Sequence, residues 1–103
     1  MLNSISIVGR ISKEVYYVDN KAYIDIQVKR PCFLEIGKEI WDDFSVQLWK
    51  GLEEMINDVG KMGTTLAIRG RLIVNQENSD DSILRYTVIY AEIIEILDKY
   101  FYK

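Results

Sequence analysis

Histidine is absent from this sequence of 103 residues, and Cys32 is its only cysteine. Such a chain lacks the ligands of a histidine or cysteine zinc site and cannot use histidine as a general acid or base. One cysteine also excludes an internal disulfide, which fits a reducing cytoplasm. We therefore expect a cytoplasmic protein that is not an enzyme and that needs no metal and no cofactor.

Long apolar runs are also absent, and the N-terminus has no basic segment followed by an apolar one. We expect no membrane-spanning segment, no export signal and no membrane partner. The composition is 49% hydrophobic and 28% charged, as in ordinary globular proteins. A chain of this length suits one domain with a modest core, so we predict a single domain over residues 1–103.

The net charge of −3 argues against a protein that works only by neutralising phosphates. The imbalance lies in the second half of the chain. Residues 1–50 hold seven basic and seven acidic side chains, whereas residues 51–103 hold six basic and nine acidic ones. The excess acidic residues fall mostly in a predicted helix and a predicted loop, so a basic face can persist on the strands.

Apolar side chains alternate with polar ones in several segments, which predicts β-strands. The predicted strands are 2–11, 22–30, 43–49, 64–74 and 84–97. The last segment is apolar at both parities, as a strand covered on both faces would be. Phe44, Val46 and Leu48 are expected to point into the core, as are Leu72 and Val74.

Residues that favour turns separate these strands. Gly9 predicts a bulge or bend in the first strand. Residues 15–21 predict a turn region closed by Asp19-Asn20, whose side chains suit tight turns. Pro31, the only proline, is expected to end the second strand because it lacks the N–H of the ladder. The polar segment 75–82 predicts a mobile connection.

Leu52, Met55, Ile56 and Val59 fall at i, i+3, i+4 and i+7, which predicts an amphipathic helix of about three turns. The expected order is therefore three strands, a helix and two strands, without room for parallel crossovers beyond that helix. This is the order of a five-stranded OB-fold barrel, an all-β fold with one helix between strands 3 and 4.

Several short segments resemble the bacterial single-stranded DNA-binding proteins in their order and spacing. They are Ile7-Val8-Gly9-Arg10-Ile11, Glu14-Val15-Tyr16-Tyr17, Ile24-Asp25-Ile26-Gln27-Val28, Val46-Gln47-Leu48-Trp49-Lys50, Lys61-Met62-Gly63-Thr64, Ile68-Arg69-Gly70-Arg71-Leu72 and Arg85-Tyr86. The resemblance covers most of the chain. It implies an OB fold that binds single-stranded DNA without sequence preference, in replication, recombination, repair or mobile-element transfer. It also implies a homo-oligomer, usually a tetramer that pairs subunits through the first strand.

The resemblance assigns base stacking to aromatic side chains, which is plausible physically because every base offers a π-face. Trp49 falls where the family has an aromatic at the end of strand 3, Trp41 lies near another such position, and Tyr17 matches an aromatic near the first turn. Neighbouring basic residues are expected to follow the phosphates. These ssDNA-binding candidates are Arg10, Lys29, Arg30, Lys50, Arg69 and Arg71.

Structural interpretations of the same residues stay open. An outward tryptophan such as Trp49 can be half-buried in a subunit interface, and Tyr17 and Trp41 can simply pin loops. Arg69 and Arg71 can pair with carboxylates across the strands and merely solubilise the sheet.

Two segments depart from the family pattern. Gln76 and Glu77 stand where the family has an aromatic, so we expect little DNA binding from that hairpin. The chain stops at Lys103 after three aromatic residues at 100–102, which we expect to pack on a neighbour. Since the family's acidic tail is absent, recruitment of replication partners by that route is not expected. Ile73 and Asn75 also stand at basic positions that lead to the hairpin. These missing charges and the acidic balance favour an alternative, an OB-fold adaptor of the primosome type with weak nucleic-acid affinity.

Overall fold

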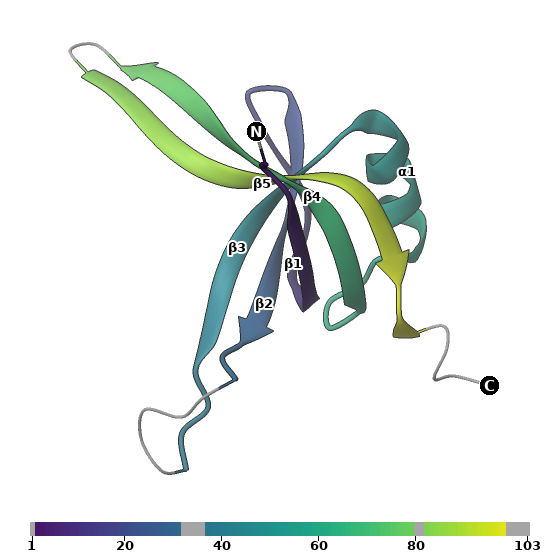
Figure 1. Ribbon diagram of the computed structural model, residues 1–103. Helices are drawn as coiled ribbons and strands as arrows, with labels where there is room; N and C mark the ends of the chain where they lie inside the picture. Colours follow the sequence, from purple (N-terminus) through teal and green to yellow (C-terminus); the bar gives the residue numbers. More distant parts are fainter. Residues whose placement is uncertain (1, 32–36, 80–81, 99–103) are drawn as a thin grey trace.

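A computed structural model describes residues 2–31, 37–79 and 82–98 (Figure 1). The elements are β1 (Ile5–Val18), β2 (Lys21–Lys29), β3 (Trp41–Leu48), α1 (Lys50–Val59), β4 (Thr65–Ser79) and β5 (Ser82–Ile96). The strands form a closed barrel in the order β1-β2-β3-β5-β4, and β1 closes it by pairing with β4. β3 and β5 run parallel, whereas the other pairs are antiparallel. This is the predicted OB fold, with α1 between β3 and β4.

The core fills the barrel and reaches α1. Its buried apolar side chains are Ile11, Ala22, Ile24, Ile26, Val46, Leu48, Leu52, Ile56, Leu66, Ile68, Ile89, Ala91 and Ile94. Leu52 and Ile56 belong to α1, so the helix packs its apolar side against the barrel, as predicted. The expectation that Val59 is buried with them is wrong. The helix ends at this residue, and Gly60 takes the place next to Ile56.

β1 is longer than the predicted first strand and includes part of the segment expected to be a turn. It continues to Val18, and the turn is confined to Asp19 and Asn20, which have positive φ values of 50° and 65°. The pairing of β1 with β2 has register irregularities between Ile11 and Tyr16. Such irregularities bend a strand and increase its twist, so β1 can follow the curved barrel without ending.

No bulge lies at Gly9, where a bulge or bend was predicted. Gly9 pairs regularly with Leu66, and a Cβ atom at this position would lie 2.8 Å from the backbone oxygen of Gln27. A side chain at Gly70 would collide with the backbone of Tyr90. Both glycines thus allow adjacent backbones of the barrel to approach closely.

The β4–β5 hairpin projects from the barrel (Figure 1). The sequence had predicted a mobile connection over residues 75–82 of this hairpin. β4 pairs with β5 as far as Ser79 and Ser82, so that prediction is wrong. Leu72 and Val74, predicted to be buried, are exposed because the projecting hairpin leaves the closed barrel. The Cα radius of gyration is 15.1 Å, whereas a compact domain of this length has about 13 Å.

The composition of β5 predicted a strand covered on both faces. That prediction is wrong for parts of the strand. Ile83 and Leu84 are exposed on the hairpin, and Ile93 is exposed on the barrel. In β3, Val46 and Leu48 are buried as predicted, but Phe44 is 37% exposed. The pairing of β5 with β3 involves Val46 and Gln47 and stops short of Phe44.

Cys32, the loop over 32–36 and the aromatic residues at 100–102 lie outside the described residues. Within the described part of the chain, no helix is long and apolar enough to cross a membrane.

Candidate nucleic-acid interface

One outer face of β1, β2 and β3 collects many of the aromatic and charged candidates. Residues directly opposite each other on paired strands share a face of the sheet. Lys29 pairs in this way with Trp41, and Tyr16 with Tyr23. We call this surface the β1–β3 face; its residues are Arg10, Lys13, Tyr16, Tyr23, Asp25, Gln27, Lys29, Trp41, Asp43, Ser45 and Gln47.

Arg10 and Trp41 form a cation–π pair at one end of this face. The guanidinium carbon of Arg10 lies 4.1 Å from the centroid of the Trp41 ring. Arg10 Nε also donates to Gln27 Oε1 over 3.4 Å. With Lys29, these residues line a groove of about 370 Å³. The groove therefore combines an aromatic face with fixed positive charge, the two components of a single-strand binding surface.

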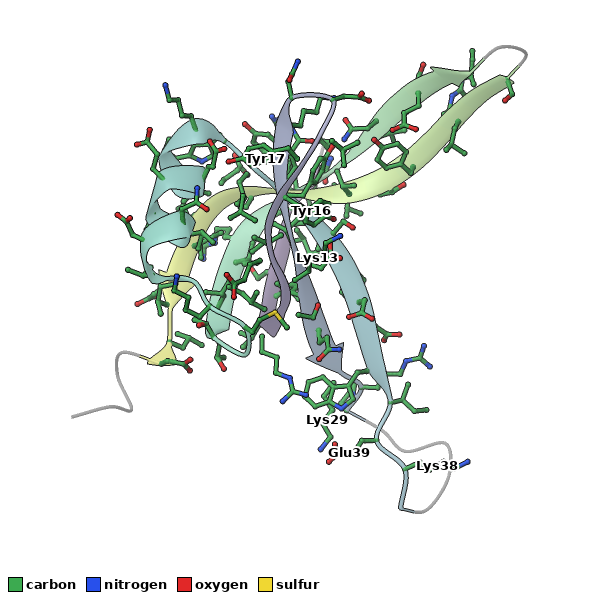
Figure 2. All side chains as sticks on the ribbon, turned by 180° about the vertical axis from the view of Figure 1, so that it is seen from behind. Lys13, Tyr16, Tyr17, Lys29, Lys38 and Glu39 are labelled. Carbon is green, nitrogen blue, oxygen red and sulfur yellow. The ribbon has the colours of Figure 1, made fainter. Side chains whose placement is uncertain are left out.

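Two ion pairs lie at the same end of the β2–β3 hairpin. Lys29 Nζ lies 2.9 Å from Glu39 Oε1, and Arg30 donates two hydrogen bonds of 2.9 Å to Asp42. Figure 2 shows Lys29 and Glu39 near the tip of the hairpin. The hydrogen bond from Lys29 lowers the pKa of Glu39, and the hydrogen bond from Arg30 lowers that of Asp42. The four side chains are 37% to 57% exposed, so solvent weakens each pair, and a phosphate can compete for its cation.

A tyrosine cluster lies farther along the β1–β3 face. The rings of Tyr16 and Tyr23 stack with centroids 5.7 Å apart, and Lys13 Nζ lies 4.1 Å from the Tyr16 centroid (Figure 2). The Tyr16 hydroxyl donates to Asp25 Oδ1 over 2.6 Å, and Ser45 Oγ donates to the same oxygen over 3.2 Å. Burial, followed by the bond to Asp25, raises the pKa of Tyr16. Tyr16 is therefore held as a neutral, oriented ring.

Asn75 anchors the base of the β4–β5 hairpin to this cluster. It is only 7% exposed, and its amide nitrogen donates to the Tyr23 hydroxyl over 2.9 Å and to Gln47 Oε1 over 3.0 Å. Burial raises the pKa of Tyr23 to about 12. A buried amide needs such partners, so these bonds set the position of the hairpin relative to β2 and β3.

Trp49 lies apart from the cluster, at the N-terminus of α1 rather than in β3. Its side chain is 46% exposed, its Nε1 donates to the backbone oxygen of Glu92 over 3.4 Å, and its ring packs on Gly51, where a Cβ atom would collide with it. Lys50, the first helical residue, is exposed beside it. Both side chains are accessible, but the residues of β3 separate Trp49 from Trp41 by roughly 26 Å at ~3.3 Å per residue.

Tyr17 also lies away from the β1–β3 face. It is exposed, and its hydroxyl is hydrogen-bonded to Glu53 and Asn57 of α1. The bond to Glu53 is the main cause of its raised pKa. Tyr17 lies in β1 rather than in the predicted turn, and it contacts the helix.

Arg69 and Arg71 are both exposed on β4. The guanidinium carbon of Arg71 lies 5.4 Å from the centroid of the Tyr90 ring, and Tyr90 is the partner of Gln47 across the β3–β5 pair. Arg71 therefore extends the β1–β3 face onto β5 and β4. Arg69 instead lines a groove of about 440 Å³ with Val8 and Ile93.

The candidates from the sequence thus fall into separate groups. Arg10, Lys29 and Trp41 share the β1–β3 face, with Arg30 next to it. The other candidates lie near α1 or on β4 (Tyr17, Trp49, Lys50, Arg69 and Arg71). Sequence analysis missed the tyrosine cluster and Lys13. It selected Tyr17 instead of Tyr16, since the register irregularities of β1 hide which of the two shares a face with Trp41.

No protein-family model matches the chain. A curated relative, Single-stranded DNA-binding protein 1 of Streptococcus pyogenes serotype M18, is 28% identical over an alignment of 105 positions, which covers 96% of this chain and 81% of that protein. The resemblance to single-stranded DNA-binding proteins is thereby confirmed.

Two solved structures have the same fold. The small single-stranded DNA-binding protein from Streptomyces coelicolor has a TM-score of 0.66 at 17% identity, covering 96% of this chain and 99% of that one. The Plasmodium falciparum SSB in complex with ssDNA has a TM-score of 0.76 at 17% identity, covering 95% and 96%. These likenesses establish the OB fold.

Proposed function

We propose that this protein binds single-stranded DNA without sequence preference, by stacking bases on aromatic rings and by contacting phosphates with lysine and arginine. The β1–β3 face is the main support, because it joins the Arg10–Trp41 pair to the partly exposed ring of Tyr16, which stacks on the buried ring of Tyr23. The curated relative is itself named as a single-stranded DNA-binding protein. An OB fold binds about 4–16 nucleotides of a single strand, which suits aromatic groups spread along a strand.

Within this proposal, Trp41 and Trp49 are the stacking residues, and Arg10, Lys29, Arg30, Lys50, Arg69 and Arg71 contact phosphates. Tyr17 has the weakest support, because its hydroxyl is engaged by α1. The processes that such binding serves are replication, recombination, repair or mobile-element transfer. The single cysteine fits a cytoplasmic location.

We propose further that the protein is a homo-oligomer, with a tetramer favoured over a dimer. Val8 and Ile93 are 55% and 59% exposed and line one groove on the outside of β1, β4 and β5. Exposed apolar side chains that gather in one groove mark an interaction site. Arg69 and Glu95 line the same groove, so charged side chains border the exposed apolar ones.

Titration with oligo-dT, followed by tryptophan fluorescence at two salt concentrations, tests DNA binding. We expect quenching at low salt that weakens as salt is added, with log K falling by about 0.7 per log unit of salt for each phosphate contact. Absence of quenching at low salt would contradict the proposal.

That negative outcome would leave the second candidate, an OB-fold adaptor that binds other proteins. The observation in its favour is the charge balance: the chain carries a net charge of −3, and the cations of Lys29 and Arg30 already contact carboxylates.

A further inference from the structure

A cavity lies between the β1–β3 face and the β4–β5 hairpin. Its volume is about 550 Å³, within the range of about 300–1,000 Å³ typical of ligand pockets. Four aromatic side chains line it: Tyr16, Tyr23, Phe44 and Tyr86. They lie on β1, β2, β3 and β5, so the barrel and the base of the projecting hairpin form this cavity together.

Negative side chains line this cavity, whereas a positive side chain lies at its edge. Asp43 and Glu77 are among the lining residues, and none of the described lining residues is a lysine or arginine. Lys13 lies over the ring of Tyr16, which belongs to the lining. The carboxylates would repel a phosphate from the cavity. A base can occupy the cavity while its phosphate stays outside, near Lys13.

The hydroxyl groups of the cavity increase its acceptor character. Tyr16 and Ser45 both line the cavity, and both donate their protons to Asp25. The remaining lone pairs of the Tyr16 and Ser45 oxygens can accept hydrogen bonds from a ligand, as can the carboxylates of Asp43 and Glu77. Such a wall suits a ligand that donates hydrogen bonds.

We propose that this cavity is a nucleobase subsite that prefers a base with an exocyclic amino group, and so prefers cytosine to thymine. The inference rests on the proposed single-strand binding and adds a preference at this one subsite, whereas the other stacking and phosphate contacts accept any base. Cytosine presents an N4 amino donor, which Asp and Glu accept in known recognition, whereas thymine presents carbonyl acceptors around its one N–H donor. The aromatic rings supply stacking that any base can use, and the carboxylates supply the discrimination. Glu77 thus gives the hairpin a role, although the sequence predicted little DNA binding there.

The test compares the affinities of the full chain for oligo-dC and oligo-dT of equal length at pH 8, with oligo-dU to remove the effect of the thymine methyl group. We expect oligo-dC to bind about 3- to 10-fold more tightly than either other ligand, the effect of one net hydrogen bond. The Asp43→Asn, Glu77→Gln double variant should reduce this ratio to about 1, since an amide can also donate to a carbonyl. Glu54→Gln, an exposed change on α1, should keep the ratio and serves as the matched control.

The outcomes separate this inference from the proposed function. Equal affinity for the three ligands, or tighter binding of oligo-dT, would overturn the base preference and leave single-strand binding intact. A preference that persists in the double variant would overturn the role of the carboxylates. Failure of all three ligands to bind at low salt would instead reject the proposed function itself.

Discussion

The guanidinium of Arg10 lies over the indole of Trp41, with its carbon 4.1 Å from the ring centroid. The contact joins β1 to β3 across β2, at the end of the barrel where the β2–β3 hairpin extends. Arg10 covers one face of the ring and holds it in place, so an incoming base meets an oriented aromatic surface beside a positive charge. Preorganisation of this kind reduces the entropy lost on binding.

Replacement of Trp41 or Trp49 by alanine should weaken binding of oligo-dT by about 5- to 160-fold each, the value of one base stacked on an aromatic ring. The residues are too far apart to interact directly, so the free-energy losses of the double variant should add. Fluorescence anisotropy of labelled oligo-dT measures both effects. A double variant no weaker than one single variant would show that one of these rings does not contact DNA.

Replacement of Arg71 by glutamine should make binding less sensitive to salt, because its guanidinium lies beside Tyr90 on the extended β1–β3 face. Loss of one phosphate contact lowers the slope of log K against log salt by about 0.7. Lys61→Gln, an exposed change after α1, is the control. Equal slopes for Arg71→Gln and the wild type would remove Arg71 from the DNA path.

The Ile93→Glu variant should have a lower solution mass than the wild type, because it places a carboxylate in the exposed apolar groove shared with Val8. Desolvating that charge would oppose association through the groove. Light scattering coupled to size exclusion measures the mass. Val59→Glu, a similar change on α1, should leave the mass unaltered, and a wild-type monomer would refute the proposed homo-oligomer.

The Gly70→Ala variant should be destabilised by roughly 1–3 kcal/mol, the usual cost of overpacking. Its methyl group would collide with the backbone of Tyr90, which cannot rotate away. Gly51→Ala is an informative contrast, because its methyl group meets the movable Trp49 ring and alanine favours a helix by about 1 kcal/mol. Urea unfolding should therefore show a large loss for the first variant and little for the second. Equal stabilities would contradict the close approach of β4 and β5.

Alkaline pH should weaken the fold through Tyr23, whose pKa in the folded state is raised to about 12. An unfolded tyrosine has a pKa of about 10, so the unfolded chain loses this proton first. The stabilisation is complete below about pH 10 and is lost as the pH rises towards 12. Melting temperatures of the wild type should fall more steeply over this range than those of Tyr23→Phe. Parallel curves would show that this phenol does not contribute.

Local patterns in the sequence were enough to predict the OB fold. The strict alternation around Ile24 and Ile26 identified β2, and the helical spacing of Leu52 and Ile56 identified α1. These patterns predict the elements correctly because each depends only on the burial of one face against the core, and not on which strand lies next to it. The patterns do not predict burial at Leu72 and Val74. Their apolar alternation continues into the hairpin, which lies outside the barrel and leaves both side chains exposed.

The amino-acid sequence alone determined the order of the elements and the resemblance to single-stranded DNA-binding proteins, because periodicity and short motifs are local properties. Tertiary structure decided which side chains share a surface. It placed Trp41 with Arg10 and Tyr16 rather than with Tyr17, and it created the cavity between the barrel and Glu77. Strand register and the path of a hairpin depend on contacts between distant segments, and a shift of one residue moves a side chain to the opposite face.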